Sequence, residues 1–241
     1  MSVSERIAPE ASRYAFVHGV QRTKQTLAEW QTNPWPALAP WFTGSFAAAI
    51  ALLGATWLIG GLSSANGAAV QTHLPPFVVG DLGDVGNIVG RNLLVLALHA
   101  MACVAGFIAG SSLPLQAQDR RGLSRLIHER GGRIAIAFVV LATTFSLSAQ
   151  AIVLGGEAAA VAARLSTSPG VLLVVLLPHA IIELTALFLP LAAWIIASRR
   201  GDWDQLLAAT VVTVAIALPM LVLAALIEVY ISPHVMHALV G

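Results

Sequence analysis

Long apolar runs alternate with short polar connections along this chain of 241 residues. A helix needs about 20 apolar residues to cross the hydrocarbon core of a bilayer. Five runs are long enough: Pro36–Leu62, Asn92–Gly110, Ile134–Leu154, Val171–Ala197 and Leu206–Tyr230. The pattern therefore predicts an all-α fold, a polytopic membrane helical bundle with five transmembrane helices.

Three prolines lie inside the last two runs, at Pro178, Pro190 and Pro219. A proline within a helix removes the hydrogen bond to the residue four positions back, and it bends the helix there. We therefore expect the fourth and fifth helices to be tilted or kinked.

The segment before the first run predicts an additional helix with one apolar face. Its side chains recur at spacings of three and four residues, at Phe16, Val20, Thr23, Leu27 and Trp30. This spacing is typical of a helix lying on a membrane surface, although a solvated helix shows it as well. We expect Asn33 and Pro34 to end this helix. We assign residues 1–35 to a cytoplasmic amphipathic segment, 36–235 to the membrane domain and 236–241 to a short external tail.

Composition supports a membrane protein. Hydrophobic residues make up 57% of the chain and charged residues only 10%, whereas soluble domains carry about 25% charged residues. The single cysteine, Cys103, excludes an intrachain disulfide. Residues 1–35 are polar and mixed in charge, unlike a cleavable signal peptide, so we expect the first apolar run to be a permanent anchor.

Basic residues are distributed unevenly among the connections. Eleven of the thirteen lie in the N-terminal segment, the second connection or the fourth: Arg6, Arg13, Arg22, Lys24, Arg120, Arg121, Arg125, Arg130, Arg133, Arg199 and Arg200. Only Arg91 and Arg164 flank the other two connections. Because cytoplasmic loops are enriched in Lys and Arg, the N-terminus is predicted to be cytoplasmic and the C-terminus external, across the bacterial plasma membrane.

Two patterns in the connections have both a functional and a structural interpretation. His73, Asp81 and Asp84 lie in the first external loop. Their side chains suit a divalent cation, but their spacing fits no ion-binding loop, so we favour a solvated loop. Gly201 is expected to end the fourth helix, and Asp202 and Gln205 have the spacing of a capping box for the fifth.

Polar side chains also lie inside the apolar runs, where a charge costs about 2.5–3.5 kcal/mol at the bilayer centre. They are His99, Gln150, His179, Glu183 and Glu228. Counting about 1.5 Å of rise per residue places them between the middle of the membrane and its outer face. We take this polar intramembrane cluster as the candidate functional site.

Within this set, His179 and Glu183 are four residues apart and share one helix face. Such a pair can bind a metal together with His99 or Glu228, relay protons, or join helices through hydrogen bonds. We favour the structural role, and expect no metal, because no complete ligand set is visible. Glu183 is then expected to be buried and to accept a hydrogen bond from another span.

Two segments, LPHAIIELTALFL from Leu177 and LAALIEVYISP from Leu223, carry a resemblance to a known family. They resemble the Pro-His-Gly-x-x-Glu and Ile-Glu-x-x-x-Ser-Pro signatures of the stage II sporulation protein M family, over about residues 36 to 235. The matching positions are Asn92, Pro178, His179, Glu183, Ile227, Glu228, Ser232 and Pro233. Ala180 replaces the usual glycine, Thr185 a common proline, and Arg91 one of two asparagines.

The resemblance implies a multi-span membrane protein without a demonstrated catalytic activity. In endospore formers such a protein assembles with partners that degrade peptidoglycan. We therefore expect a non-enzymatic scaffold for cell-envelope or peptidoglycan-remodelling proteins, with no cofactor and no nucleic-acid partner. The alternative is a transport protein or permease subunit whose polar cluster lines a pathway. A water-accessible cavity reaching Glu183 favours transport, and a dry, fully paired cluster favours the scaffold.

Small residues predict close helix packing, and a homodimer is one way to use them. They are Gly44, Ala48, Gly106 and Gly110. Gly106 and Gly110 form a small-xxx-small pair, which permits close approach of a second helix. Packing within the chain explains this pair equally well.

The topology can be tested by labelling cysteines introduced at Ser124 and Ser168. We expect Ser168→Cys to react with a membrane-impermeant reagent in intact cells, because the third connection is predicted to be external. Ser124→Cys should react only after the membrane is opened. Labelling of Ser124→Cys from outside would contradict the predicted orientation.

Overall fold

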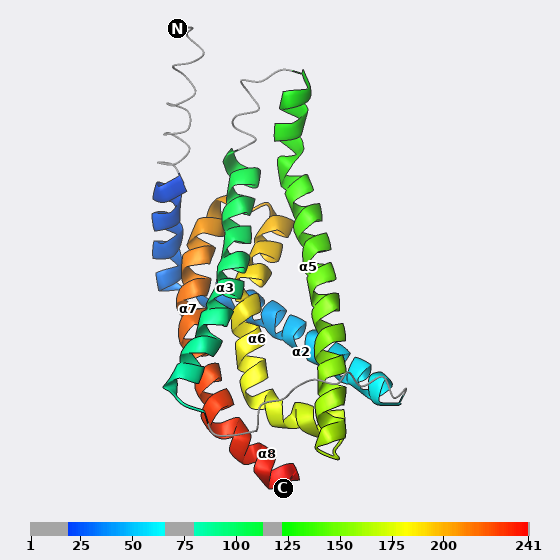
Figure 1. The fold of residues 1–241 in the computed structure, drawn as a ribbon. Helices are drawn as coiled ribbons and strands as arrows, with labels where there is room; N and C mark the ends of the chain where they lie inside the picture. The colour runs from blue at the N-terminus through cyan, green and yellow to red at the C-terminus, as the bar shows by residue number, and fades with distance from the viewer. Residues whose placement is uncertain (1–18, 66–79, 113–121, 241) are drawn as a thin grey trace. The chain divides into compact units, whose positions relative to one another are not determined.

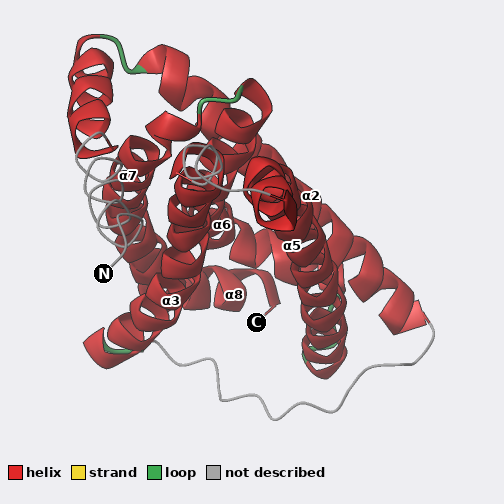
Figure 2. Cartoon of the chain, turned by 90° about the horizontal axis from the view of Figure 1, so that it is seen from above, coloured by secondary structure: helices red, strands yellow, loops and turns green. Residues whose placement is uncertain are grey.

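The computed structural model describes residues 19–65, 80–112 and 122–240. Several expectations from the sequence fall outside these residues, or on side chains within 123–133 that are not described. They concern Arg6, Arg13, Phe16, His73, Arg120, Arg121, Arg125, Arg130 and Arg133. All the described elements are helical, and no strand occurs among them (Figure 2).

The helices are named in the order in which they follow one another along the chain (Figure 1). After a first helix at 19–32 come α2 (Trp35–Ala65), α3 (Leu82–Phe107) with the π-helical turn η1 (Ile108–Ser112), α5 (Gly122–Arg164), α6 (Pro169–Arg200), the 3₁₀ turn η2 (Trp203–Gln205), α7 (Leu206–Leu226), the π-helical turn η3 (Ile227–Ile231) and α8 (Ser232–Val240). Residues 236–240, assigned to a tail from the sequence, continue α8.

Five helical stretches are long and apolar enough to cross a membrane, as the sequence predicts. They are Trp35–Ser64, Leu82–Ser111, Ile136–Arg164, Pro169–Arg200 and Trp203–Leu239. Each contains one of the five apolar runs, apart from residues 134–135 of the third. The predicted fold class, a helical membrane bundle, is confirmed.

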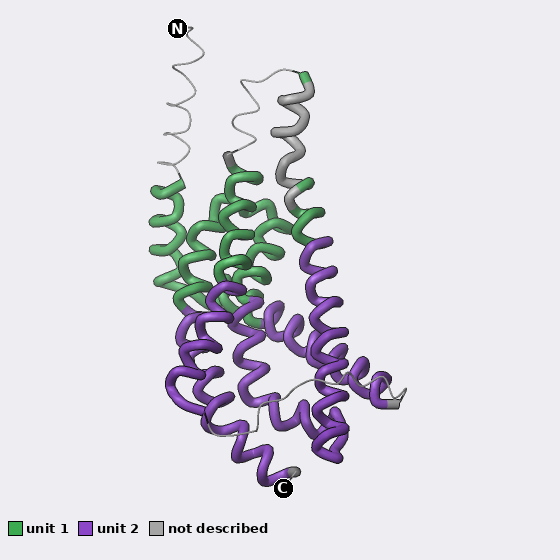
Figure 3. Tube along the Cα trace, in the orientation of Figure 1, with its two compact units in different colours: residues 1–42, 97–140, 189–215 green, residues 43–96, 141–188, 216–241 purple. Residues whose placement is uncertain are grey.

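The chain forms two compact units (Figure 3). Unit 1 comprises residues 1–42, 97–140 and 189–215, and unit 2 comprises 43–96, 141–188 and 216–241. Each spanning helix contributes one segment to each unit. The segments predicted to be cytoplasmic belong to unit 1, and the predicted external connections belong to unit 2.

The core of unit 1 forms where tryptophans meet glycines. Trp194 is buried with Cys103, Ala197 and Leu206, and the Cys103 thiol donates a hydrogen bond to the Pro190 carbonyl at 3.2 Å. A Cβ at Gly106 would collide with Trp194, and a Cβ at Gly110 would collide with Trp203. The small-xxx-small pair is therefore used for packing inside this unit.

The helix at 19–32 is fixed to the rest of unit 1 by two contacts. Nε of Arg22 donates a hydrogen bond to Asp204 at 2.6 Å, and this carboxylate raises the pKa of Arg22 above its usual value. The rings of Trp30 and Trp41 meet edge to face, with centroids 5.1 Å apart. This helix ends before Asn33 and Pro34, as the sequence predicts.

The capping of two helix starts differs from what the sequence predicts. Asp81 Oδ1 accepts from the backbone N–H groups of Gly83 and Asp84, and Asp84 Oδ2 accepts from the N–H of Asp81. The two aspartates thus form a capping box on α3. The capping box predicted at Asp202 is wrong: its side chain makes no capping bond.

Gly201 ends α6 as the sequence predicts, because a positive φ of 80° suits a residue without a Cβ. The Asp202 N–H donates to the Ala197 carbonyl at 3.0 Å. This six-residue closure is typical of a helix C-terminus that reverses direction, and it leaves the next helix to begin with the 3₁₀ turn η2.

α6 also bends inside unit 2, between its yellow-green beginning and its yellow middle (Figure 1). Pro178 lies in this helix and cannot donate to the carbonyl four residues back. Ser168 Oγ accepts from the Val171 N–H at 3.2 Å and caps the helix start, with Pro169 as its first residue.

We expect Gly106→Ala to lower the free energy of unfolding by about 1–3 kcal/mol, because overpacking a filled core forces side chains out of place. The new Cβ would lie 2.9 Å from Cδ1 of Leu206 as well as against Trp194. Gly90→Ala is the matched control in α3, since a Cβ there meets no atom within 4 Å. Thermal unfolding in detergent compares them, and equal melting temperatures would contradict this packing.

Candidate functional site

The second motif coincides with a π-helical turn, η3, between α7 and α8. Ser232 donates its backbone N–H to the Ile227 carbonyl, five residues back. Pro233 follows and has no N–H to offer, and its ring would clash with a carbonyl four residues back in a regular helix. The widened turn avoids that clash. Such turns in helices are often found at functional sites.

The first motif lies on α6 in the same unit, and the two motifs meet through a buried hydrogen bond. His179 Nδ1 and Ser232 Oγ are 3.0 Å apart, and the two side chains are 7% exposed each. Residues 53 positions apart in the chain are thereby joined. The bond fastens α6 to the junction of η3 and α8.

The serine hydroxyl favours one of the two neutral tautomers of His179. Ser232 Oγ donates to the Ile227 carbonyl at 3.4 Å. If that hydroxyl proton is engaged there, Oγ accepts from Nδ1–H of His179, and Nε2 keeps a free electron pair. A neutral histidine held in this way is a base or a metal ligand.

Glu183 and Glu228 complete a compact polar group with His179, which we call the His–Glu–Glu cluster. One ligand atom from each of the three side chains lies within 4.8 Å of the others. His179 is buried, and the two glutamates are half-buried. Two carboxylates and an imidazole therefore face one another inside the membrane-spanning part of unit 2.

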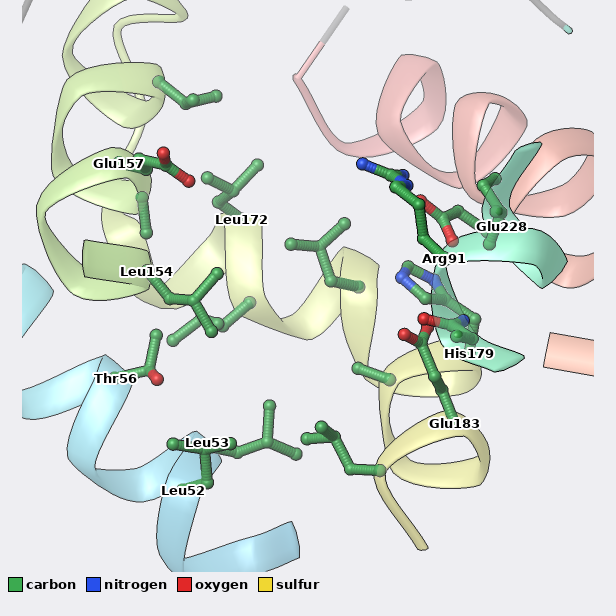
Figure 4. Close-up of a pocket in the computed structure, with 18 residues that line it drawn as sticks. Leu52, Leu53, Thr56, Arg91, Leu154, Glu157, Leu172, His179, Glu183 and Glu228 are labelled. Atoms are coloured by element: carbon green, nitrogen blue, oxygen red, sulfur yellow. The ribbon is translucent and has the colours of Figure 1, made fainter. Parts of the chain in front are cut away.

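The cluster lies at one side of a cavity of about 340 Å³ within unit 2. Figure 4 shows His179, Glu183, Glu228 and Arg91 together on one side, and Glu157 across the cavity. Leu52, Leu53, Leu154 and Leu172 are among the apolar wall residues. The site is thus a polar group at the edge of an apolar chamber.

Two side chains from α3 interact with the glutamates of the cluster. Arg91 is exposed and attracts both glutamates electrostatically. Asn92 is 9% exposed and faces Glu183, but its Nδ2 atom completes no hydrogen bond with the described residues. A neighbour of Glu183 from another span is therefore Asn92. Glu183 itself is half-buried, where a buried side chain was expected.

One comparison with known proteins gives a match over the region of both motifs. The model of the family described as Stage II sporulation protein M matches residues 131–233. The family resemblance is confirmed over these residues, while the rest of the predicted stretch, with Asn92, lies outside the match. The matched region holds α6, α7, η3 and most of α5, and it makes up less than half of the chain. No curated protein and no solved structure matches this chain.

The other members of the predicted polar set are not part of the His–Glu–Glu cluster. His99 is partly buried and belongs to unit 1. Gln150 belongs to unit 2, is exposed, and donates a hydrogen bond to Ser146 at 3.2 Å. Neither residue lines the cavity. Their part in a common site stays a prediction.

The remaining residues of the sporulation protein M signatures frame the cluster. Pro178 is exposed, Pro233 is buried and Ile227 supplies the carbonyl of the π-turn. Ala180, which replaces the family glycine, lines the cavity. The role of Ser232 as the partner of His179 was absent from the expectations, because sequence spacing does not relate side chains on different helices.

Removing the serine hydroxyl tests the contact between the motifs. We expect Ser232→Ala to lower the free energy of unfolding by about 1–3 kcal/mol, because the buried His179 Nδ1 loses its partner. Ser146→Ala is the matched control, since it removes an exposed bond within one helix, and it should change stability by less than about 0.5 kcal/mol. Melting curves in detergent measure both, and an unchanged Ser232→Ala protein would exclude the contact.

Proposed function

We propose that the protein is a non-enzymatic membrane scaffold that recruits cell-envelope or peptidoglycan-remodelling proteins in a bacterial plasma membrane. The observation that carries the proposal is the meeting of both sporulation protein M motifs in one buried contact, His179 with Ser232. In this contact the motif residues hold helices together. A defined arrangement of α6, η3 and α8 would offer partners a constant surface.

The proposal places these partners on the external side of the membrane. Unit 2 contains the predicted external connections and both motifs. The positive-inside distribution of arginines supports an external position for this end, with the N-terminus cytoplasmic. A second copy of the chain remains among the proposed partners. Gly106 and Gly110 no longer argue for it, because Trp194 and Trp203 pack against them.

A transport protein is the second candidate, and one observation favours it. The cavity of about 340 Å³ reaches Glu183 and has ionisable groups on one side. Transporters often bind their substrates at bends or breaks in spanning helices near the middle of the membrane, and α6, which supplies part of the cavity wall, is a bent helix (Figure 1). The two candidates differ in how the cavity is reached from the two membrane faces.

Crosslinking in intact cells tests the scaffold. We expect a tagged full-length chain, crosslinked before extraction, to enrich proteins that carry external peptidoglycan-remodelling domains. Ser232→Ala should reduce this enrichment, while Ser146→Ala should not, because only the first disturbs the contact between the motifs. An equally tagged, unrelated multi-span protein is the background control, and enrichment no higher than this background would contradict the scaffold.

Accessibility of the cavity separates the two candidates within the same strains. In a Cys103→Ala background, Thr56→Cys places a thiol in the cavity wall. A scaffold predicts reaction with a membrane-impermeant reagent from one face at most. Reaction from both faces, in intact cells and in inverted vesicles, would favour transport.

A further inference from the structure

We propose that His179, Glu183 and Glu228 bind a divalent transition-metal cation of the Zn²⁺ or Mn²⁺ class, which links α6 to η3. The inference goes beyond the scaffold function, because ion binding to the purified chain requires no partner. The sequence alone favoured a structural role for His179 and Glu183 over metal binding, because it showed no complete set of ligands. The structure supplies a third ligand at the right place.

The geometry of the cluster suits a small cation. One nitrogen or oxygen atom from each of the three side chains lies within 4.8 Å of the others. Metal–ligand bonds of about 2.0–2.2 Å bring ligand atoms to about 3–4 Å from one another. Small side-chain rotations of the two glutamates are enough to close that difference, because neither of them is fully buried.

Charge supports a divalent ion. Two ionised carboxylates this close repel each other, and the surroundings inside the apolar bundle screen them poorly. A divalent cation neutralises both at once and leaves a site of no net charge. Among the described residues, Arg91 also lines the cavity, is exposed and attracts both glutamates.

The histidine is oriented as metal-binding histidines usually are. Such a residue donates its second ring N–H to an oxygen that fixes its tautomer and its plane. Ser232 Oγ, 3.0 Å from Nδ1, supplies that oxygen in the tautomer that carries its proton on Nδ1. In that tautomer the electron pair of Nε2 is available to the ion.

The amide of Asn92 also points to a ligand in this cavity. Asn92 lines the cavity, is 9% exposed and interacts with Glu183, but its Nδ2 has no hydrogen bond of good geometry to that carboxylate or to another described residue. A buried donor of this kind needs an acceptor. Three protein ligands leave at least one coordination position for water, and the oxygen of such a water is an acceptor for Asn92.

The donor set indicates the class of ion. An imidazole with two carboxylates suits Zn²⁺, Mn²⁺ and related transition metals. Mg²⁺ and Ca²⁺ prefer sites made only of oxygen, and Mg²⁺ keeps several waters. We therefore expect the site to discriminate against both.

The test measures ion binding to the purified full-length chain after chelator treatment. Calorimetry with Zn²⁺ and Mn²⁺ should show about one ion per chain at a site with three protein ligands. Glu183→Gln and Glu228→Gln should each weaken that binding at least about tenfold, and Asn92→Ala should weaken it less, as substitutions beyond the direct ligands generally do. Mg²⁺ in tenfold excess should not displace the ion.

Glu157→Gln is the matched control, because Glu157 lines the same cavity opposite the cluster (Figure 4). It should bind as the unaltered chain does, and ions held elsewhere on the chain should be insensitive to all the variants. Glu183→Asp keeps a carboxylate and serves if the glutamine variant fails to fold. Absence of Zn²⁺ and Mn²⁺ binding, or equal affinity in Glu183→Gln, Glu228→Gln and Glu157→Gln, would overturn the proposal. Crosslinking results do not enter this test, so the scaffold and the ion site can fail separately.

Discussion

Inside the hydrocarbon of a bilayer, each backbone N–H and C=O must find its hydrogen bond within the protein, and this constraint governs the whole chain. It explains why all five apolar runs are helical over their described residues. It also explains where the polar side chains at helix ends are used. Asp81 and Asp84 bind the free N–H groups that begin α3, and Ser168 does the same for α6.

Prolines have no N–H group and so interrupt the helical hydrogen bonds locally. Two of them lie next to residues of the site. Pro178 lies in α6, directly before His179. Ser232 and Pro233 follow the π-turn that carries Glu228. In a regular α-helix, side chains share a face only at spacings of three or four residues. The widened turn brings Glu228 and Ser232 to α6 together, where they meet His179.

The cost of ionisable groups in the membrane connects the two roles suggested for this site. Glu183 and Glu228 are retained in an apolar environment although hydrogen-bonded neutral side chains could join helices there. A scaffold needs only a constant arrangement of helices, and the contact of His179 with Ser232 contributes to one. Two carboxylates beside that contact, at the edge of a cavity, add a capacity to hold a positive ion between the same elements.

The sequence by itself determined the class of the protein, its five spans, the break at Asn33 and Pro34, the end of α6 at Gly201 and the family signatures. These features depend on local chemistry: apolar length, missing N–H groups and the freedom of glycine. It also placed His179 and Glu183 on one face, because both belong to one helix.

Only the tertiary structure decided which side chains on different helices meet. It paired His179 with Ser232, set Asn92 beside Glu183 and packed Trp194 against Gly106. It also placed His99 in the other unit. Periodicity shows which face of a helix is polar, but the neighbour of that face depends on the rotation, the bend and the packing of another helix, far away in the chain.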